Sequence, residues 1–242
     1  MSLAQFQHIP LDNGNAKAEQ PNQPIIAVLN YIEKWIPTFI KESKTEQIVN
    51  EKGLTQRFVS ILLVNLNDIY PFTFVPEWME DETKGNSPAV DIGILTKDNS
   101  ISLRNRCFFV LEAKKLGVTE PIRNKEYLVG HYIKKNGKPK YLTCGGMERF
   151  KKSIHGKMLN QCGMIGYMFN NNFDFWHHQI NNWVEELILT NSDSTIFWSK
   201  EDKLLLQSKN HQKARYTSKN LRTKVDSKKD TVLIYHTWID LQ

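Results

Sequence analysis

One apolar run constrains the fold of this chain more than any other feature. Residues 107–111 read Cys-Phe-Phe-Val-Leu without a polar interruption, and Glu112 follows directly. A short, continuous apolar run is typical of a strand that is buried on both faces. Such a strand needs a packing layer on each side of its sheet. The run therefore predicts a layered α/β fold, with a carboxylate where this inner strand ends.

The spacing of hydrophobic residues on either side of the run supports the same α/β fold class. Apolar residues recur every three or four positions in the first part of the chain, as in amphipathic helices, and then come in short runs. Pro37 predicts a kink or a break in the first helix, and Asn136-Gly137 indicates a turn. The expected helices span residues 24–43, 45–67, 147–155 and 173–189, and the expected strands span residues 72–75, 89–95, 106–113, 163–169 and 231–241. This order of elements favours a mixed central sheet flanked by helices.

Length and composition favour one globular domain. The chain has 242 residues, of which 40% are hydrophobic and 24% are charged, within the range of globular proteins. A chain of this length buries roughly 70–75% of its unfolded surface, so it needs no disulfide or structural metal to fold. We expect a polar N-terminal arm over residues 1–23 and a single domain over 24–242. That domain would have a core at about 45–190 and a basic, β-containing extension at about 191–242.

The sequence shows neither a secretory signal nor a membrane span. Its longest apolar run, residues 59–66, is far shorter than the ~18–20 residues that a membrane helix requires. The three cysteines, Cys107, Cys144 and Cys162, are odd in number and widely spaced, which favours reduced thiols. We therefore expect a cytoplasmic protein without a membrane partner.

The basic charge is concentrated in two segments. The formal net charge is +6, but residues 113–157 carry +9 and residues 199–230 carry +6, whereas the rest of the chain carries −9. An acidic body with two basic segments is typical of a protein that binds a polyanion, because phosphates attract lysine and arginine. Solvated, lysine-rich loops would give the same distribution. Charge alone leaves both interpretations open.

Three charged residues interrupt or follow the apolar strands. Asp91 lies within the run 89–94, Glu112 ends the run 107–111, and Lys114 follows on the same face as Glu112 if the strand continues. Close carboxylates repel each other, and burial makes each charge costly, so a hard divalent ion such as Mg²⁺ would relieve both penalties. Such an ion polarises a phosphoryl oxygen and activates water, and a nearby lysine can orient or deprotonate that water. Each residue taken alone is also typical of a satisfied carboxylate or a weak surface salt bridge.

The array of Asp91 followed by Glu112-Ala113-Lys114 resembles the PD-(D/E)xK nuclease superfamily, which includes many restriction endonucleases. The resemblance covers about residues 45–169 and includes the order of helices and strands. It implies a restriction-endonuclease-like core. One departure is visible, because Pro88 lies three residues before Asp91 and not directly before it.

The resemblance also implies roles for individual residues. Asp91 and Glu112 would hold the catalytic Mg²⁺, for which Mn²⁺ could substitute, and the main-chain carbonyl of Ala113 would be a further ligand. Lys114 would orient the attacking water. Glu51, on the helix before the strands, would complete the site through the metal or its waters.

Basic and polar residues near this array are candidates for nucleic-acid contacts. Arg149, Lys151 and Lys152 follow Gly145-Gly146 at an expected helix N-terminus, which favours phosphate binding, although a solvated basic face is the alternative. Arg149 could also order the Glu112 carboxylate. Tyr127 could stack on a base. The remaining candidates are Gln56, Arg57, Lys115, Arg215, Lys219 and Arg222.

Other chemistries lack a motif. Cys144, His155, Cys162 and the pair His177-His178 do not have the paired spacing of a zinc site, and no Cys-x-x-Cys occurs. The phosphate-binding loop of nucleotide motors and the Gly-x-Ser-x-Gly elbow of serine hydrolases are absent as well. His236 lies in an apolar run and is more typical of a core histidine than of a catalyst.

Together these features predict a Mg²⁺-dependent nuclease, expected to be an endonuclease, that hydrolyses DNA phosphodiester bonds. The resemblance implies a role in restriction or phage defence, with a second copy of the chain, in a homodimer, or other protein subunits as further partners. One alternative is a catalytically silent module of the same fold that binds nucleic acid or recruits a partner. The intact set of Asp91, Glu112 and Lys114 argues against it. A second alternative is an RNA nuclease, because phosphodiester chemistry does not reveal the sugar.

Overall fold

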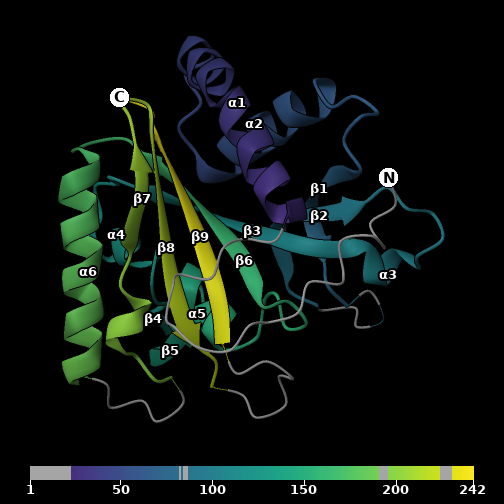
Figure 1. Cartoon of the computed structure of the whole chain (residues 1–242). Helices are drawn as coiled ribbons and strands as arrows, with labels where there is room; N and C mark the ends of the chain where they lie inside the picture. The colour runs from purple at the N-terminus through teal and green to yellow at the C-terminus, as the bar shows by residue number, and fades with distance from the viewer. Residues whose placement is uncertain (1–22, 82, 84–86, 191–195, 224–230) are drawn as a thin grey trace, which may run out of the picture.

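The structure is a computed structural model that describes residues 23–81, 83, 87–190, 196–223 and 231–242 (Figure 1). The arm expected over residues 1–23 therefore lies, except for Gln23, outside the described residues. Among the residues that are described, no helix combines the length and hydropathy needed to cross a lipid bilayer.

A seven-stranded mixed sheet forms the centre of the molecule, with the strand order β1-β2-β3-β6-β9-β8-β7. The strands are β1 (Phe72–Met79), β2 (Ala89–Thr96), β3 (Cys107–Leu116), β6 (Gln161–Met168), β7 (Leu205–Lys209), β8 (Lys213–Leu221) and β9 (Thr231–Asp240). The first three form an antiparallel meander, and the pairs β3–β6 and β6–β9 are parallel. The mixed α/β class predicted from the sequence is confirmed at this level.

Helices cover both faces of the sheet. Helices α1 (Gln23–Thr45) and α2 (Glu51–Val64) pack on one face, and α5 (Gly146–Lys151) and α6 (Phe173–Thr190) lie on the other (Figure 1). Residues of β3 belong alternately to the two cores: Phe109 and Leu111 pack with α1 and α2, whereas Val110 packs with α5 and α6. The central strand is thus buried on both faces, as the uninterrupted apolar run predicts.

Helix α1 runs through Pro37 without the expected break. Its buried face continues on both sides of the proline, with Ile32 and Ile36 before it and Phe39 and Ile40 after it. Burying each such side chain stabilises the fold by roughly 1.5–3 kcal/mol. Together these contacts outweigh the ~3 kcal/mol that an interior proline costs a helix.

Helix α2 begins later than the expected residue 45. The side chain of Asn50 caps it by accepting a hydrogen bond from the amide of Gly53, at 2.7 Å. A Cβ atom at position 53 would lie 2.9 Å from the Asn50 amide nitrogen, so glycine permits this close cap. The cap makes Glu51 the first helical residue, which fixes its place at the end of α2.

The two basic segments contain strands that the hydrophobic pattern did not predict. The first holds a separate hairpin of β4 (His131–Lys135) and β5 (Lys138–Leu142), with Asn136 and Gly137 at its turn. The second supplies β7 and β8, which with β9 form one side of the central sheet and not an appended extension. The remaining short elements are α3 (Leu103–Arg106), α4 (Pro121–Lys125) and the 3-10 helix η2 (Lys200–Asp202).

Candidate active site

Three elements bring the predicted catalytic residues to one place. Asp91 lies on β2, Glu112 and Lys114 lie on β3, and Glu51 begins α2. The ammonium of Lys114 connects two of the acids, at 2.9 Å from Glu112 Oε1 and 3.5 Å from Glu51 Oε1. The structure therefore assembles residues that are up to 63 positions apart in the sequence.

The Asp91 side chain continues the hydrogen bonding between β2 and β3 beyond the end of their backbone ladder. Ile92 and Leu111 form the last pair of that ladder, and beyond it Asp91 Oδ2 accepts a hydrogen bond from the amide of Ala113, at 2.7 Å. Burial, together with the nearby negative charge of Glu112, raises the pKa of Asp91 to about 7. A carboxylate held in this way gains from any cation placed beside it.

Glu112 is fully buried, yet its positively charged neighbours favour its ionised form. Its Oε1 accepts from Lys114 Nζ at 2.9 Å and from Arg149 Nη1 at 2.8 Å. Burial alone would raise the pKa of Glu112, but the charges of Lys114, His155 and Arg149 outweigh it and hold that pKa below its ordinary value. Glu112 Oε2 is buried and has no hydrogen-bond partner among the described residues.

Glu51 and Lys114 are held by reciprocal contacts. Glu51 Oε2 accepts from the main-chain amide of Lys115 at 2.9 Å. Burial would lower the pKa of Lys114, but the carboxylates of Glu112, Glu51 and Asp91 raise it above its ordinary value. Lys114 is therefore an ammonium at neutral pH, which favours an orienting role over that of a base.

His155 is a neighbour of the site that the sequence did not reveal. Its ring is fully buried between two acids, with Nδ1 3.7 Å from Glu80 Oε2 and Nε2 3.6 Å from Glu112 Oε2. Its Nε2 also lies 3.3 Å from Arg149 Nη1. The sequence placed His155 at the end of a helix, but α5 ends at Lys151 and the chain then turns toward Glu112. No local pattern connects it to Glu80.

A small surface pocket of about 110 Å³ adjoins the site. Its lining includes Asp91 and Glu51 together with exposed residues of α2 and β1, so these two carboxylates are accessible from solvent. The other lining residues are Lys52, Thr55, Gln56, Pro76 and Glu77.

The donor set fits a hard divalent ion held by few protein ligands. Glu112 Oε2 is an orphaned, buried acceptor, and Asp91 is a carboxylate whose charge is costly without a cation. Glu51, Asp91 and Glu112 do not form a group of three donors within 4.8 Å of one another, so they are not a ready three-carboxylate cage. Mg²⁺ commonly takes one or two carboxylates and several waters. The residues therefore fit Mg²⁺ held by Asp91 and Glu112, with Glu51 acting through water. The role of the Ala113 carbonyl stays a prediction.

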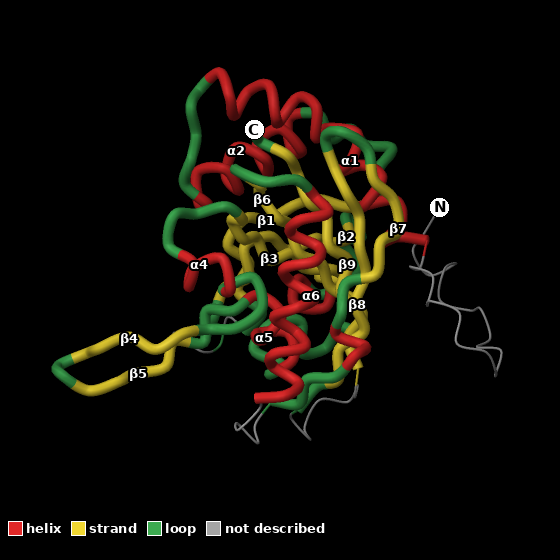
Figure 2. The backbone as a smooth tube through the Cα atoms, turned by 90° about the vertical axis from the view of Figure 1, so that its left-hand side faces the viewer, coloured by secondary structure: helices red, strands yellow, loops and turns green. Residues whose placement is uncertain are grey.

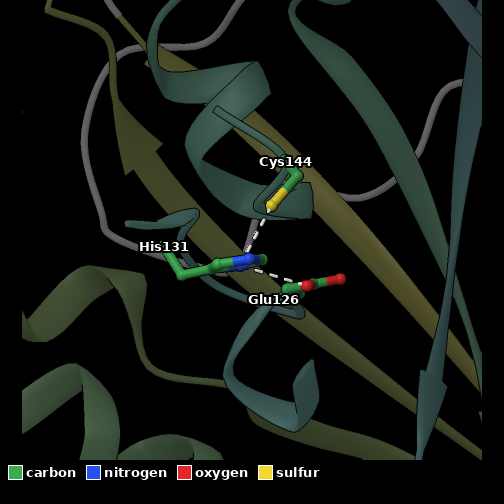
Figure 3. Close-up of side chains that lie close together, drawn as sticks. All are labelled: Glu126, His131 and Cys144. Carbon is green, nitrogen blue, oxygen red and sulfur yellow. Dashed lines mark hydrogen bonds and ion pairs between the residues drawn. The ribbon is translucent and has the colours of Figure 1, made fainter. Parts of the chain in front are cut away.

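A different group of possible metal ligands lies at the base of the β4–β5 hairpin (Figure 3). His131 Nδ1 is 3.1 Å from Glu126 Oε1 and 3.5 Å from Cys144 Sγ. Burial and the charge of Glu126 raise the pKa of Cys144, so this cysteine is a thiol at neutral pH. The three side chains offer donors that zinc accepts, and in the described parts of the chain no other three such donors lie within 4.8 Å of one another. Of the zinc candidates from the sequence, only Cys144 belongs to this group.

Two of the predicted nucleic-acid contacts are buried in the protein, which corrects the prediction for them. The hydroxyl of Tyr127 bonds His236 Nδ1 and accepts from Trp238 Nε1, each at 2.8 Å, so its ring cannot stack on a base. Lys151 is fully buried and pairs with Asp202 at 2.5 Å. Their partners are 51 to 111 positions away in the sequence, which local patterns could not reveal.

Arg222 is likewise engaged inside the protein and is not free to bind phosphate. Its guanidinium donates to three main-chain carbonyls, those of Gly156, Lys157 and Leu159, at 2.7–2.8 Å. It therefore fixes the loop that carries His155. The prediction of a nucleic-acid contact at Arg222 is wrong for this structure.

The other predicted contacts remain at or near the surface, with varying freedom. Gln56 and Lys219 are exposed, and Arg149 reaches the Glu112 carboxylate. Lys115 lies over the Phe169 ring at 4.6 Å and lines a pocket of about 300 Å³. The rest form ion pairs within the chain: Arg57 with Glu42 and Glu46, Lys152 with Glu148, and Arg215 with Glu33.

No family model, curated protein or solved structure matches the chain. Any functional conclusion therefore depends on the residues and their geometry.

Proposed function

We propose that this chain is a Mg²⁺-dependent deoxyribonuclease with a restriction-endonuclease-like core. The observation that carries the proposal is the convergence of Asp91, Glu112, Lys114 and Glu51 beside a surface pocket. A structural salt-bridge network would need neither a buried Glu112 oxygen that accepts no hydrogen bond nor the costly charge of Asp91. Both features favour a cation-binding role.

Each residue has a distinct part in this proposal. The metal ion would supply a Lewis acid that polarises a phosphoryl oxygen and lowers the pKa of water. The ammonium of Lys114 orients that water and offsets the charge that develops on the phosphate. Glu51 holds Lys114 and the amide of Lys115 in place. Arg149 keeps Glu112 ionised and correctly oriented.

DNA as the substrate, and a role in restriction or phage defence, follow from the resemblance to PD-(D/E)xK nucleases. The hydrolytic chemistry itself would serve RNA equally well. Substrate type is therefore part of the test.

The test is a cleavage assay on plasmid DNA, single-stranded DNA and RNA, with Mg²⁺, Mn²⁺ or EDTA. We expect metal-dependent cleavage of DNA that falls by at least about 100-fold in Asp91→Ala and in Lys114→Ala. Matched controls are Asp68→Ala and Lys41→Ala, which alter exposed residues away from the site. Absence of cleavage with both metals, or full activity in either site variant, would contradict the proposal.

A further inference from the structure

The hairpin of β4 and β5 projects from the body of the protein (Figure 2). It forms a two-stranded sheet of its own, and each strand has five residues, or about 17 Å of extended chain. Its turn is Asn136-Gly137, both with positive φ, as a tight two-residue hairpin turn requires. The hairpin is therefore a defined arm and not an irregular loop.

The two faces of this arm differ in chemistry. Cross-strand pairs place Lys135 opposite Lys138 and Ile133 opposite Lys140, so three lysines lie on one face. The other face carries Lys134 and the pair of Tyr132 and Tyr141, whose rings meet edge to face at 5.0 Å. The four lysines are exposed, and none forms an ion pair with any residue that the structure describes. The arm contains no acidic residue.

The pairing at the tip is unfavourable for the protein alone. Lys135 and Lys138 are directly opposite each other, and like charges in that position destabilise a hairpin. A polyanion lying along the arm would turn this repulsion into attraction. The charge of the arm is thus complementary to phosphate.

Hydrogen bonds hold the base of the arm and connect it to the candidate active site. Buried Glu148 accepts from the amide of Gly130 at 2.6 Å, from the Tyr141 hydroxyl at 3.1 Å and from Lys152 at 2.7 Å. The next residue, Arg149, donates to the carbonyl of Thr143 at 3.2 Å and to Glu112 at 2.8 Å. Arg149 thus contacts both the strand exit and a predicted metal ligand.

We propose that the β4–β5 hairpin is a DNA-binding arm that enters the major groove of a B-form duplex and holds it against the site at Glu112. A two-stranded ribbon fits this groove, which is about 12 Å wide, and the lysines would contact the phosphates that border it. The identity of the ligand as substrate rests on the proposed nuclease function. Binding by the arm does not depend on cleavage.

The geometry favours duplex DNA over other polyanions. The major groove of A-form RNA is deep and narrow, so a ribbon cannot enter it. An acidic protein or an anionic lipid surface would also attract lysines, but neither has a groove that matches a projecting ribbon. An RNA duplex and an anionic lipid surface therefore serve as comparison ligands in the test.

The test measures binding of a labelled 30-base-pair DNA duplex by fluorescence anisotropy in EDTA, over a range of salt concentrations. The arm variant replaces Lys134, Lys135, Lys138 and Lys140 with glutamine. The control variant makes the same change at four exposed lysines outside both basic segments, Lys34, Lys41, Lys44 and Lys97, so both variants lose the same charge. Parallel titrations use an RNA duplex and phosphatidylserine vesicles. The Tm of each variant confirms folding, and we expect the arm variant to be no less stable than wild type.

We expect the arm variant to bind DNA at least about tenfold more weakly, with a salt slope smaller by about 3–4, while the control stays close to wild type. Equal binding by the arm variant and wild type, or a loss confined to RNA or vesicles, overturns the inference even if cleavage of DNA persists. If the wild-type protein binds DNA through the arm but never cleaves it, the inference about the arm is supported and the proposed nuclease function is contradicted. If the wild-type protein binds no DNA, both proposals are contradicted.

Discussion

At the scale of single residues, Asp91 shows a conflict between stability and chemistry. Its carboxylate is partly buried beside Glu112, and both effects favour its protonated form. Asp91 also accepts a hydrogen bond from the amide of Ala113. That hydrogen bond stabilises the fold, whereas the negative charge of Asp91 does not. A charge that costs stability in the metal-free protein is one that a bound cation would stabilise.

This conflict predicts that Asp91→Asn stabilises the metal-free protein while it abolishes cleavage. Because the pKa of Asp91 is raised to about 7, its contribution to stability is complete below its ordinary pKa near 3.8 and is lost as the pH rises through 7. At pH 8 the asparagine should therefore raise the free energy of unfolding by about 2 kcal/mol, or about 4–8 °C in Tm. The measurement is thermal unfolding in EDTA at pH 5 and pH 8.

The control for this prediction is Asp68→Asn, which should change Tm little at either pH. The gain in Asp91→Asn should shrink at pH 5, where the native carboxyl is already protonated. A variant that is no more stable than wild type at pH 8 would show that the charge of Asp91 is already compensated.

Single residues could be placed from the sequence where the alternation of side chains along a strand determines which way each one points. Asp91, Glu112 and Lys114 could be expected near one another because they interrupt or follow neighbouring apolar runs, and the structure places them on the adjacent strands β2 and β3. Such placement failed for Tyr127 and Lys151, whose partners His236 and Asp202 come from distant elements. Charge and residue type suggest a surface role, but burial depends on tertiary contacts.

At the scale of elements, the position of Glu51 depends on one cap. Asn50 ends the preceding loop and starts α2 through its bond to Gly53. Without this bond the first turn of the helix would fray, and Glu51 belongs to that turn. Helix stability and the position of Glu51 in the proposed active site are therefore coupled at Asn50.

We predict that Asn50→Ala lowers the free energy of unfolding by about 1 kcal/mol and also reduces the cleavage rate. Asn50→Asp or Asn50→Ser keeps a capping oxygen and should restore both. Urea unfolding and cleavage kinetics on the same preparations check this. Loss of stability without any change in rate would separate Glu51 from the catalytic geometry.

Elements with a strong hydrophobic period were predictable, and lysine-rich ones were not. The meander of β1, β2 and β3 and the later β6 and β9 follow from apolar runs. The strands β4, β5, β7 and β8 are rich in lysine and poor in apolar residues, so no long apolar run marks them in the sequence. In β8 the buried Ala214 and Tyr216 alternate with half-buried Lys213 and Arg215, a short pattern that a charged segment easily hides.

At the scale of the whole molecule, His236 ties together three distant parts of the chain. On β9, its ring contacts Tyr127 after α4 through Nδ1 at 2.8 Å and Ser218 on β8 through Nε2 at 2.9 Å. Burial lowers the pKa of His236 to about 3. The folded protein therefore keeps this ring neutral, whereas the unfolded chain protonates it near pH 6.5.

We predict that acid destabilises the protein through this histidine. The neutral ring contributes full stability above about pH 6.5, and that contribution is lost as the pH falls toward 3, by up to about 1.4 kcal/mol per pH unit. His236→Gln should be less stable at pH 7 but should have a shallower dependence on pH between 6.5 and 4.5. Urea unfolding at several pH values measures both slopes.

The exposed His211 provides the matched control, and His211→Gln should keep the wild-type slope. Because other groups titrate over the same range, the difference between the two variants is the informative quantity. Identical slopes in both would mean that His236 does not drive acid unfolding.

The order of strands in the sheet has a consequence for synthesis. Strand β9 lies between β6 and β8, although it follows both of them in the sequence. A chain emerging from the ribosome therefore exposes an open edge of β6 until residues 231–240 have left the exit tunnel. The seven-stranded sheet cannot close before then, so β1, β2, β3 and β6 stay separated from β8 and β7 until the last strand of the chain joins them.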